Sequence, residues 1–241
     1  MEEKMEGKME EKHERKRYFK NLSRRDYIER AYQIISTEGE TAVSIRRMAR
    51  EFGCSTTSLY RYFDNVEELI YYAYLIYLDE YLRELNRQEQ TWKDIWDMHI
   101  GIWEGYSRVA FHHPQAFNVI FFSQTSRKLT NALPEFYEMF PERLMIVSPF
   151  LQVFLRSPDL LARDMEMVKR CEEAGVISHE NGVRMNHMVC LLYKGYLKDV
   201  LDYGISENEI EPRVAEFRKE IELIVSSLAS DLLGHDYGSK L

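Results

Sequence analysis

Two short helical segments, each with its own start and stop residues, constrain the fold of this chain more than any other feature of its sequence. Ser44 can cap the first segment and Gly53 can end it. Between them, apolar residues recur at helical spacing: Ile45, Met48, Ala49 and Phe52. Ser55 can cap a second short helix that carries residues 56–63. Two short helices joined by a turn that contains a glycine predict a helix-turn-helix.

Longer helices are predicted on both sides of this pair. Ser23 and Asp26 have the form of a capping box, and Gly39 supplies the stop of the helix that they begin. Asn65 can start a long apolar helix that runs through Leu82 and ties the helix-turn-helix to the rest of the chain.

The remainder of the chain also predicts helices, and no segment predicts a strand convincingly. Breaks are expected at Arg87 to Thr91, His113-Pro114, Leu133-Pro134, Pro141, Ser157-Pro158, Gly175, Gly182 and Tyr203-Gly204. We therefore expect an all-α protein in three parts. These are a charged, disordered tail that opens with the repeat MEEK MEGK MEEK (1–21), a three-helix helix-turn-helix domain (22–68) and a larger helical domain for ligand binding and dimerisation (69–241).

Charge is distributed unevenly along the chain, whose formal net charge is -8. Residues 15–63 carry eleven basic and five acidic side chains, a net of +6, whereas everything after residue 63 sums to -11. A basic module on an acidic body is expected where only the module must approach phosphates. The charge pattern therefore favours nucleic-acid binding by the segment that predicts the helix-turn-helix.

One face of the second short helix has side chains suited to DNA recognition. With 100° per residue, Leu59 and Phe63 define its buried side. Short hydroxyl side chains allow a helix to enter the major groove, and an arginine can bond guanine with two N–H groups. A polar, solvated helix would present a similar face, so the arrangement alone leaves both interpretations open. The exposed arc is expected to carry Thr56, Thr57, Ser58, Tyr60, Arg61 and Tyr62.

The segment AYQIISTEGETAVSIRRMAREFGCSTTSLYRYFDNVEELI closely resembles the DNA-binding domain of the TetR family of transcription regulators. The resemblance covers about residues 23–69 and rests above all on Ser-Leu-Tyr-Arg-Tyr-Phe, which is similar to the family's Leu-Tyr-x-His-Phe signature. It implies a homodimer that binds a roughly palindromic operator in double-stranded DNA. Regulators of this family are usually repressors that a small molecule releases.

The resemblance also implies roles for individual residues. It places Ser44 near a phosphate at the start of the first short helix, and Thr56 and Thr57 near bases. Tyr60 and Tyr62 take positions that usually contact the DNA backbone, with Tyr62 in place of the common histidine.

Two departures from the family pattern reduce the expected phosphate contacts. Val66 stands where a lysine is usual, and Asp64 adds a negative charge nearby. Both are expected to weaken non-specific affinity. Neighbouring arginines are expected to compensate: Arg24, Arg25, Arg46 and Arg47. The predicted DNA-binding set is Ser44, Arg46, Ser55, Thr56, Thr57, Ser58, Tyr60, Arg61 and Tyr62.

Aromatic and methionine side chains are frequent in the larger domain. Such side chains can line an adaptable pocket for a small, largely apolar effector, whose identity the sequence does not give. An ordinary helical core has the same composition, so this alternative stays open. The candidate pocket residues are Trp96, His99, Trp103, Tyr106, Phe117, Phe121 and Met145.

The last segment has the most regular apolar spacing, with steps of three and four residues from Val214 to Leu228. Such a seam is expected to pack against a neighbouring helix. Gly195 lies within the preceding helix, where a glycine is unfavourable unless it permits close approach. Two such helices from each of two chains would form a four-helix bundle. The predicted dimer interface is Met188, Leu191, Gly195, Phe217, Ile221, Ile224 and Leu228.

Several classes of function find no support in the sequence. The three cysteines have no paired spacing, the histidines lack ligand spacing, and catalytic motifs are absent, so we predict no metal, cofactor or catalytic residue. No apolar run approaches the roughly 20 residues that span a bilayer, and the charged start is unlike a secretion signal. We therefore expect a cytoplasmic protein without membrane contact. The alternatives are an architectural or adaptor DNA-binding protein without ligand control, and a helical enzyme with an accessory helix-turn-helix.

Overall fold

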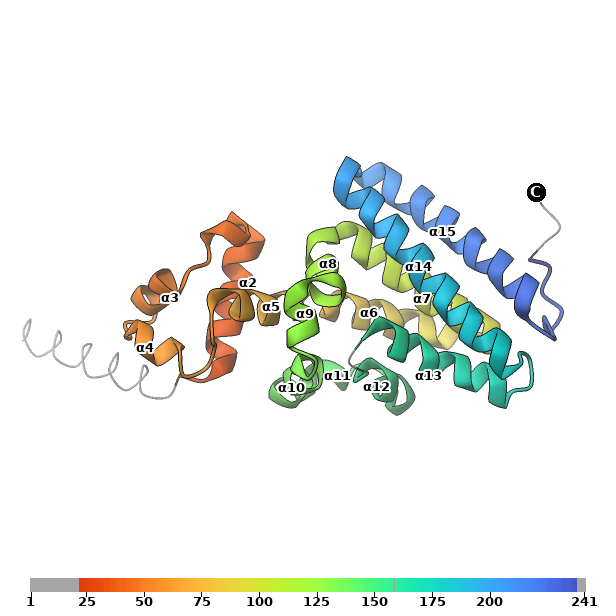
Figure 1. The fold of residues 1–241 in the computed structure, drawn as a ribbon, viewed down its shortest axis with the longest axis horizontal. Coiled ribbons are helices and arrows are strands. Elements are labelled where there is room, and N and C mark those ends of the chain that lie inside the picture. Colours follow the sequence, from red (N-terminus) through yellow and green to blue (C-terminus); the bar gives the residue numbers. More distant parts are fainter. Residues whose placement is uncertain (1–21, 158, 238–241) are drawn as a thin grey trace, which may run out of the picture. The chain divides into compact units, whose positions relative to one another are not determined.

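The computed structural model describes residues 22–157 and 159–237, and these residues form helices and connecting turns without a β-strand (Figure 1). The all-α prediction is therefore confirmed. The predicted tail over residues 1–21 lies outside the described residues. Within the described ranges, no helix has both the length and the apolar character that crossing a membrane requires.

The contacts between helices divide the chain into two compact units, with the boundary between Ile76 and Tyr77. Unit 1 contains α2 (Arg24–Glu38), η1 (Glu40–Ala42), α3 (Ile45–Glu51), α4 (Thr56–Leu59) and α5 (Val66–Leu75). The boundary lies later than the predicted residue 68 because α5 packs on α2 and so belongs to unit 1.

Unit 2 contains a larger set of helices. These are α6 (Leu78–Gln88), η2 (Glu89–Thr91), α7 (Ile95–His112), α8 (Pro114–Phe122), α9 (Gln124–Lys128), α10 (Ala132–Met139), α11 (Pro141–Leu144), α12 (Pro149–Leu155), α13 (Leu160–Glu173), α14 (His179–Tyr203) and α15 (Glu207–Leu228).

The start of each α-helix in unit 1 agrees with the cap that the sequence predicts. Ser23 begins α2 in a capping box, and Gly39 ends that helix with φ +87°. Ser44, Ser55 and Asn65 each accept a hydrogen bond from the backbone N–H three residues later, at the starts of α3, α4 and α5. These bonds satisfy N–H groups that have no partner within the helix.

Two helices of the first half are shorter than predicted. The helix α4 ends at Leu59, and residues 60–62 form a turn, although the N–H of Phe63 still bonds to the Leu59 carbonyl at 3.1 Å. The helix predicted to run from Asn65 through residue 82 divides between α5 and α6. The N–H of Ile76 bonds to a carbonyl three residues back, which tightens the last turn of α5.

The core of unit 2 forms around α7, which packs against α6, α13 and α15, while α14 packs against α13 and α15 (Figure 1). The apolar seam of α15 is part of this core. Phe217 and Ile221 are fully buried, and the Phe217 ring lies 6.2 Å from that of Trp103 on α7. The prediction that a long helix packs on this seam is confirmed.

Two of the predicted helix breaks are wrong. The helix α10 continues through Leu133-Pro134, because a proline in the first turn loses no intrahelical hydrogen bond. The helix α14 continues through Gly182, where a Cβ would lie 2.7 Å from Cγ1 of Val168, so this glycine lets α13 and α14 approach closely. At Gly195, where close approach was expected, a Cβ would meet no described atom within 4 Å.

Candidate nucleic-acid interface

The core of unit 1 determines which side of α4 faces outward. Leu59 and Phe63 are buried, as the helical periodicity predicts. The ring of Tyr27 on α2 packs edge-on against Phe52 at 4.8 Å and against Phe63 at 6.4 Å. Burial, with a weak hydrogen bond to the Cys54 thiol, raises the pKa of Tyr27. These contacts leave the opposite side of α4 in solvent.

The exposed side of α4 and the turn over residues 60–62 that follows it carry most of the predicted DNA-binding residues. Thr56, Thr57, Tyr60 and Arg61 are exposed, and Tyr60 keeps 55% of its surface open to solvent. Ser55 and Ser58 are engaged with each other, since their hydroxyl oxygens lie 3.0 Å apart. Ser44 caps α3, and its hydroxyl oxygen accepts a hydrogen bond from the backbone N–H of Arg47 at 3.2 Å.

Three arginines of unit 1 are exposed and have no ion-pair partner among the residues that the structure describes: Arg46, Arg50 and Arg61. Arg46 and Arg50 lie one helical turn apart on α3, so they share a side of that helix. The prediction included Arg46 and Arg61 but missed Arg50. The spacing of four residues from Arg46 was the signal that could have found it.

Arg47, the neighbour of Arg46, is held within unit 1. Its guanidinium donates to both carboxylate oxygens of Glu38, at 2.6 and 2.8 Å, and to Glu51 at 2.8 Å. The bonds from Arg47 hold the pKa of Glu38 below its usual value. The pKa of Glu51 is also lowered, first by Arg30 and then by Arg47. Arg47 therefore joins the end of α2 to α3.

Arg24 is also engaged inside unit 1. Its guanidinium donates to Glu68 at 2.7 Å and lies over the Tyr72 ring, 4.1 Å from the centroid. Glu68 in turn accepts from the N–H of Asp64 at 2.6 Å. The expectation that Arg24 and Arg47 offset the missing lysine is therefore corrected, because both guanidinium groups already bind carboxylates.

Tyr62 has a different environment from the one that its predicted role requires. Its hydroxyl donates to the carbonyl of Leu22 at 3.1 Å, so that proton is not free for a phosphate. Its ring packs at 5.6 Å on Tyr27. Of the two departures from the family pattern, Asp64 is exposed and Val66 is partly exposed at the start of α5.

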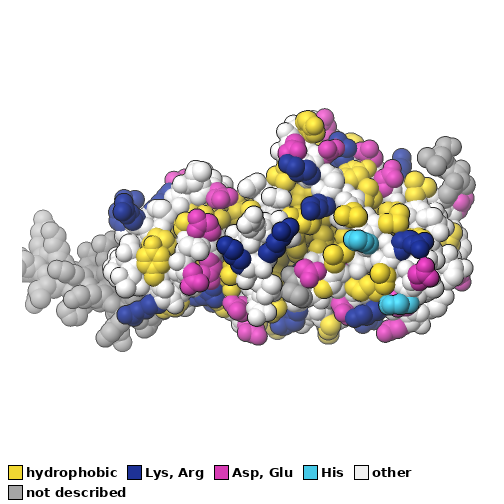
Figure 2. Space-filling view, in the orientation of Figure 1, with side chains coloured by type: hydrophobic (Ala, Val, Ile, Leu, Met, Phe, Trp, Pro, Cys, Tyr) yellow, Lys and Arg dark blue, Asp and Glu magenta, His cyan; other side chains and the backbone are white. Residues whose placement is uncertain are grey.

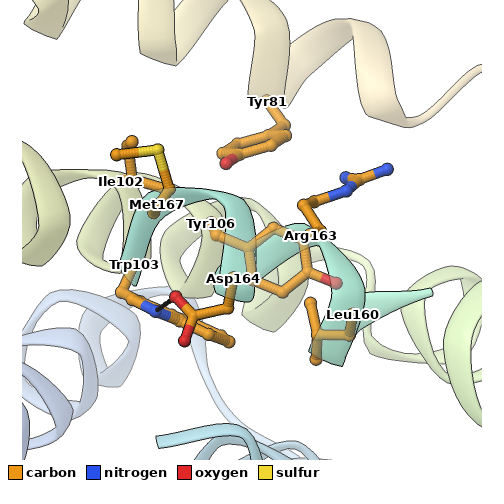
Figure 3. Close-up of a pocket in the computed structure, with 8 residues that line it drawn as sticks. All are labelled: Tyr81, Ile102, Trp103, Tyr106, Leu160, Arg163, Asp164 and Met167. Carbon is orange, nitrogen blue, oxygen red and sulfur yellow. Dashed lines mark hydrogen bonds between the residues drawn. The ribbon is translucent and has the colours of Figure 1, made fainter. Parts of the chain in front are cut away.

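A cavity lies inside unit 2, between α6, α7 and α13 (Figure 3). Its lining is Tyr81 from α6, Ile102, Trp103 and Tyr106 from α7, and Leu160, Arg163, Asp164 and Met167 from α13. Trp103 and Tyr106 belong to the predicted pocket set, and the other six were missed. The buried residues of α13 recur at spacings of three and four residues, and Arg163 and Asp164 occupy two of these positions. This spacing is the signal that could have found them.

The other predicted pocket residues lie around the cavity or away from it. His99 is buried behind it and lies 3.2 Å from the Asp164 carboxylate. The rings of Phe117 and Phe121 pack on Tyr106. Trp96 donates to the carbonyl of Asp231, and Met145 is 75% exposed. The structure thus places two of the seven predicted side chains in the cavity wall, buries three others, and leaves Phe121 partly exposed and Met145 exposed.

The predicted dimer residues separate into two groups. Phe217, Ile221 and Leu228 are buried within unit 2, and Ile224 is partly exposed. The prediction for the three buried residues is corrected, because side chains that fill the core are not available to a partner. Met188 and Leu191 of α14 are exposed, and so is Gly195.

One group of side chains in the described residues has the spacing of metal ligands. Asp94, Asp97 and His235 offer atoms that all lie within 4.8 Å of one another. Asp94 already has two structural partners: it caps α7, and it binds His235 at 2.7 Å. The N-cap and this hydrogen bond account for the group without an ion.

The fold of the chain is similar to that of solved structures. A protein of Shewanella sp. PV-4 assigned to the tetR family of transcription regulators matches with a TM-score of 0.51 and 16% identity, covering 88% of this chain and 100% of its own. The TetR-family regulator PfmR from Thermus thermophilus has a TM-score of 0.45 and 16% identity, covering 85% of this chain and 96% of its own. A tetR-family regulatory protein from Rhodococcus RHA1 has a TM-score of 0.45 and 15% identity, with 88% and 100% covered.

No protein-family model matches the sequence, and no curated protein matches it significantly. The fold is nevertheless that of the TetR-family transcription regulators, a helical helix-turn-helix domain followed by a larger helical domain. The fold implied by the sequence resemblance is therefore confirmed.

Proposed function

We propose that this chain is a DNA-binding transcription regulator whose unit 1 binds an operator. The observation that carries the proposal is the outer surface of α3, α4 and the turn after α4, where Arg46, Arg50 and Arg61 are free of ion pairs among the described residues and Thr56 and Thr57 are exposed. Arginines supply both phosphate contacts and direct contacts to guanine, and small hydroxyl residues permit a close approach. Free guanidinium groups also need not break an ion pair before they bind DNA.

A homodimer on a roughly palindromic operator is the second part of the proposal. Helix-turn-helix proteins commonly read two half-sites one helical turn apart, which requires two copies of the reading helix. Exposed hydrophobic side chains accompany α14 on the face shown in Figure 2. Met188 is 41% and Leu191 60% exposed, and Gly195 leaves space for a helix to approach. We assign this face of α14 to the dimer.

The third part of the proposal is repression that a small effector relieves. Unit 2 contains a cavity that could hold such a molecule. A ligand that favours a conformation with misaligned reading helices lowers operator affinity by its differential binding to the two conformations. On this view the protein is a regulator in the cytoplasm and not an enzyme.

Genomic binding tests this proposal. The purified full-length protein is mixed with sheared genomic DNA from its source, and the retained fragments are sequenced. We expect a few sharp sites that share a palindrome. Broad coverage without a shared sequence would support an architectural protein and overturn the proposal. Arg61→Ala is the matched variant, because Arg61 is exposed and unpaired among the described residues and its loss should spare the fold.

A further inference from the structure

The cavity of unit 2 contains a buried arginine whose charge is only partly matched. Arg163 is 3% exposed and donates through Nη2 to the carbonyl of Leu155 at 3.0 Å. Its Nε and Nη1 groups have no hydrogen-bond partner among the described residues. The guanidinium lies over the Phe121 ring, with Cζ 5.3 Å from the ring centroid.

The next residue in the chain presents the opposite charge to the same cavity. Asp164 is 4% exposed, and its Oδ1 accepts from Trp103 at 2.7 Å and lies 3.2 Å from Nε2 of His99. Its Oδ2 has no partner within the described part of the chain. Figure 3 shows that the carboxylate points towards Trp103, whereas the Arg163 side chain extends in another direction.

Unpaired polar atoms on buried charged groups are unfavourable, because these groups lose their hydration without gaining a replacement. A purely apolar ligand would leave both Arg163 and Asp164 in this condition. A ligand with an acceptor for the first and a donor for the second would satisfy both. The rest of the wall, including Tyr81, Trp103 and Met167, suits a flat apolar body between the two polar ends.

We propose that the cavity binds a small aromatic acid that carries a carboxylate at one end, for Arg163, and a hydroxyl donor at the other, for Asp164. This inference rests on the proposed function, because it treats the cavity as the effector site. It also changes the expected effector from a largely apolar molecule to one with two polar ends.

The size of the cavity restricts the ligand to a single ring. The empty volume at the lining residues is about 260 Å³, a figure that includes space open to solvent, and the room within it fits about one water molecule. A ring must therefore displace a side chain as it enters. Met167 is suited to this because its unbranched side chain adopts alternative rotamers at little cost.

Four probes separate the contributions of the two polar ends: 4-hydroxybenzoate, benzoate, phenol and toluene. Binding to the full-length protein is measured by titration calorimetry. We expect 4-hydroxybenzoate to bind most tightly, with about tenfold or greater losses for benzoate, which lacks the donor, and for phenol, which lacks the carboxylate. Equal affinity for all four probes, or binding of none, would overturn the inference. A buried water molecule alone would produce the second result.

Two substitutions assign each polar end to its residue. Arg163→Met should reduce the affinity for 4-hydroxybenzoate to that for phenol or below, because the carboxylate is then buried without a partner, and should leave phenol binding unchanged. Asp164→Asn should remove the advantage of 4-hydroxybenzoate over benzoate. If the methionine variant does not fold, Arg163→Lys takes its place, because it keeps the positive charge. It should bind 4-hydroxybenzoate with an affinity between those of the unaltered protein and the methionine variant. An unchanged preference among the probes in these variants would show that neither residue contacts the ligand.

DNA binding without any probe distinguishes this inference from the proposed function. A protein that binds its genomic sites but none of the probes refutes the ligand class alone. A protein that binds the probes but no DNA refutes the regulator proposal and leaves the cavity as a binding site.

Discussion

Arg46 and Arg47 are adjacent on α3, and the structure gives them opposite roles. Arg46 is exposed and unpaired among the described residues, whereas Arg47 binds Glu38 and Glu51. Each phosphate contact that a cation makes contributes about -0.9 to the slope of log K against log salt concentration. Arg46→Met removes one cation from each protomer of a dimer. The slope should therefore become shallower by about 1.8.

The assay is fluorescence anisotropy of a labelled operator duplex, titrated at salt concentrations between about 50 and 200 mM. Arg47→Met should change the slope much less than Arg46→Met and should lower the melting temperature, because it releases Glu38 and Glu51. Arg87→Met controls for net charge, since Arg87 is an exposed residue of unit 2 that pairs with Glu84. Equal slope changes for Arg46→Met and Arg47→Met would refute the assignment of roles.

Three further predictions test the packing, the dimer and the thiols. Gly182→Ala should destabilise the protein by about 1 to 2 kcal/mol, because overpacking outweighs the better helix propensity of alanine; a higher urea midpoint would contradict this. Leu191→Glu should convert the dimer to a folded monomer in light scattering, and an unchanged mass would exclude this face. Burial raises the pKa of Cys171 to about 12 and also raises that of Cys190, so an aromatic disulfide reagent at pH 8 should modify Cys54 alone until urea is added. Rapid modification of a second thiol in the native protein would contradict the buried positions.

Features that depend on a few neighbouring residues could be predicted from the sequence. The caps Ser23, Ser44, Ser55 and Asn65 were predicted because a cap needs only a side chain and an N–H group three residues later. The buried side of α4 followed from periodicity in the same way. The roles of the glycines in α14 could not be predicted in this way, because a glycine within a helix matters only if another helix approaches it. Gly182 lies close to α13, and nothing in the sequence of α14 shows this.

Partnerships between distant elements could not be predicted. The sequence shows that Phe217 belongs to an apolar seam, but periodicity does not tell whether the seam faces the same chain or a second copy. Arg46 and Arg47 have the same chemistry, and only the position of Glu38 at the end of α2 distinguishes them. The cavity residues Arg163 and Asp164 were missed because charged residues are expected at the surface, although both occupy positions in the apolar spacing of α13.

The most direct measurement of the central claim compares two duplexes of equal length and composition. One carries the palindrome recovered from the genomic sites, and the other carries the same bases in scrambled order. At about 150 mM salt, we predict that the full-length protein binds the first at least about a thousandfold more tightly, with two protomers per duplex. Equal affinity for both duplexes would contradict a sequence-specific regulator.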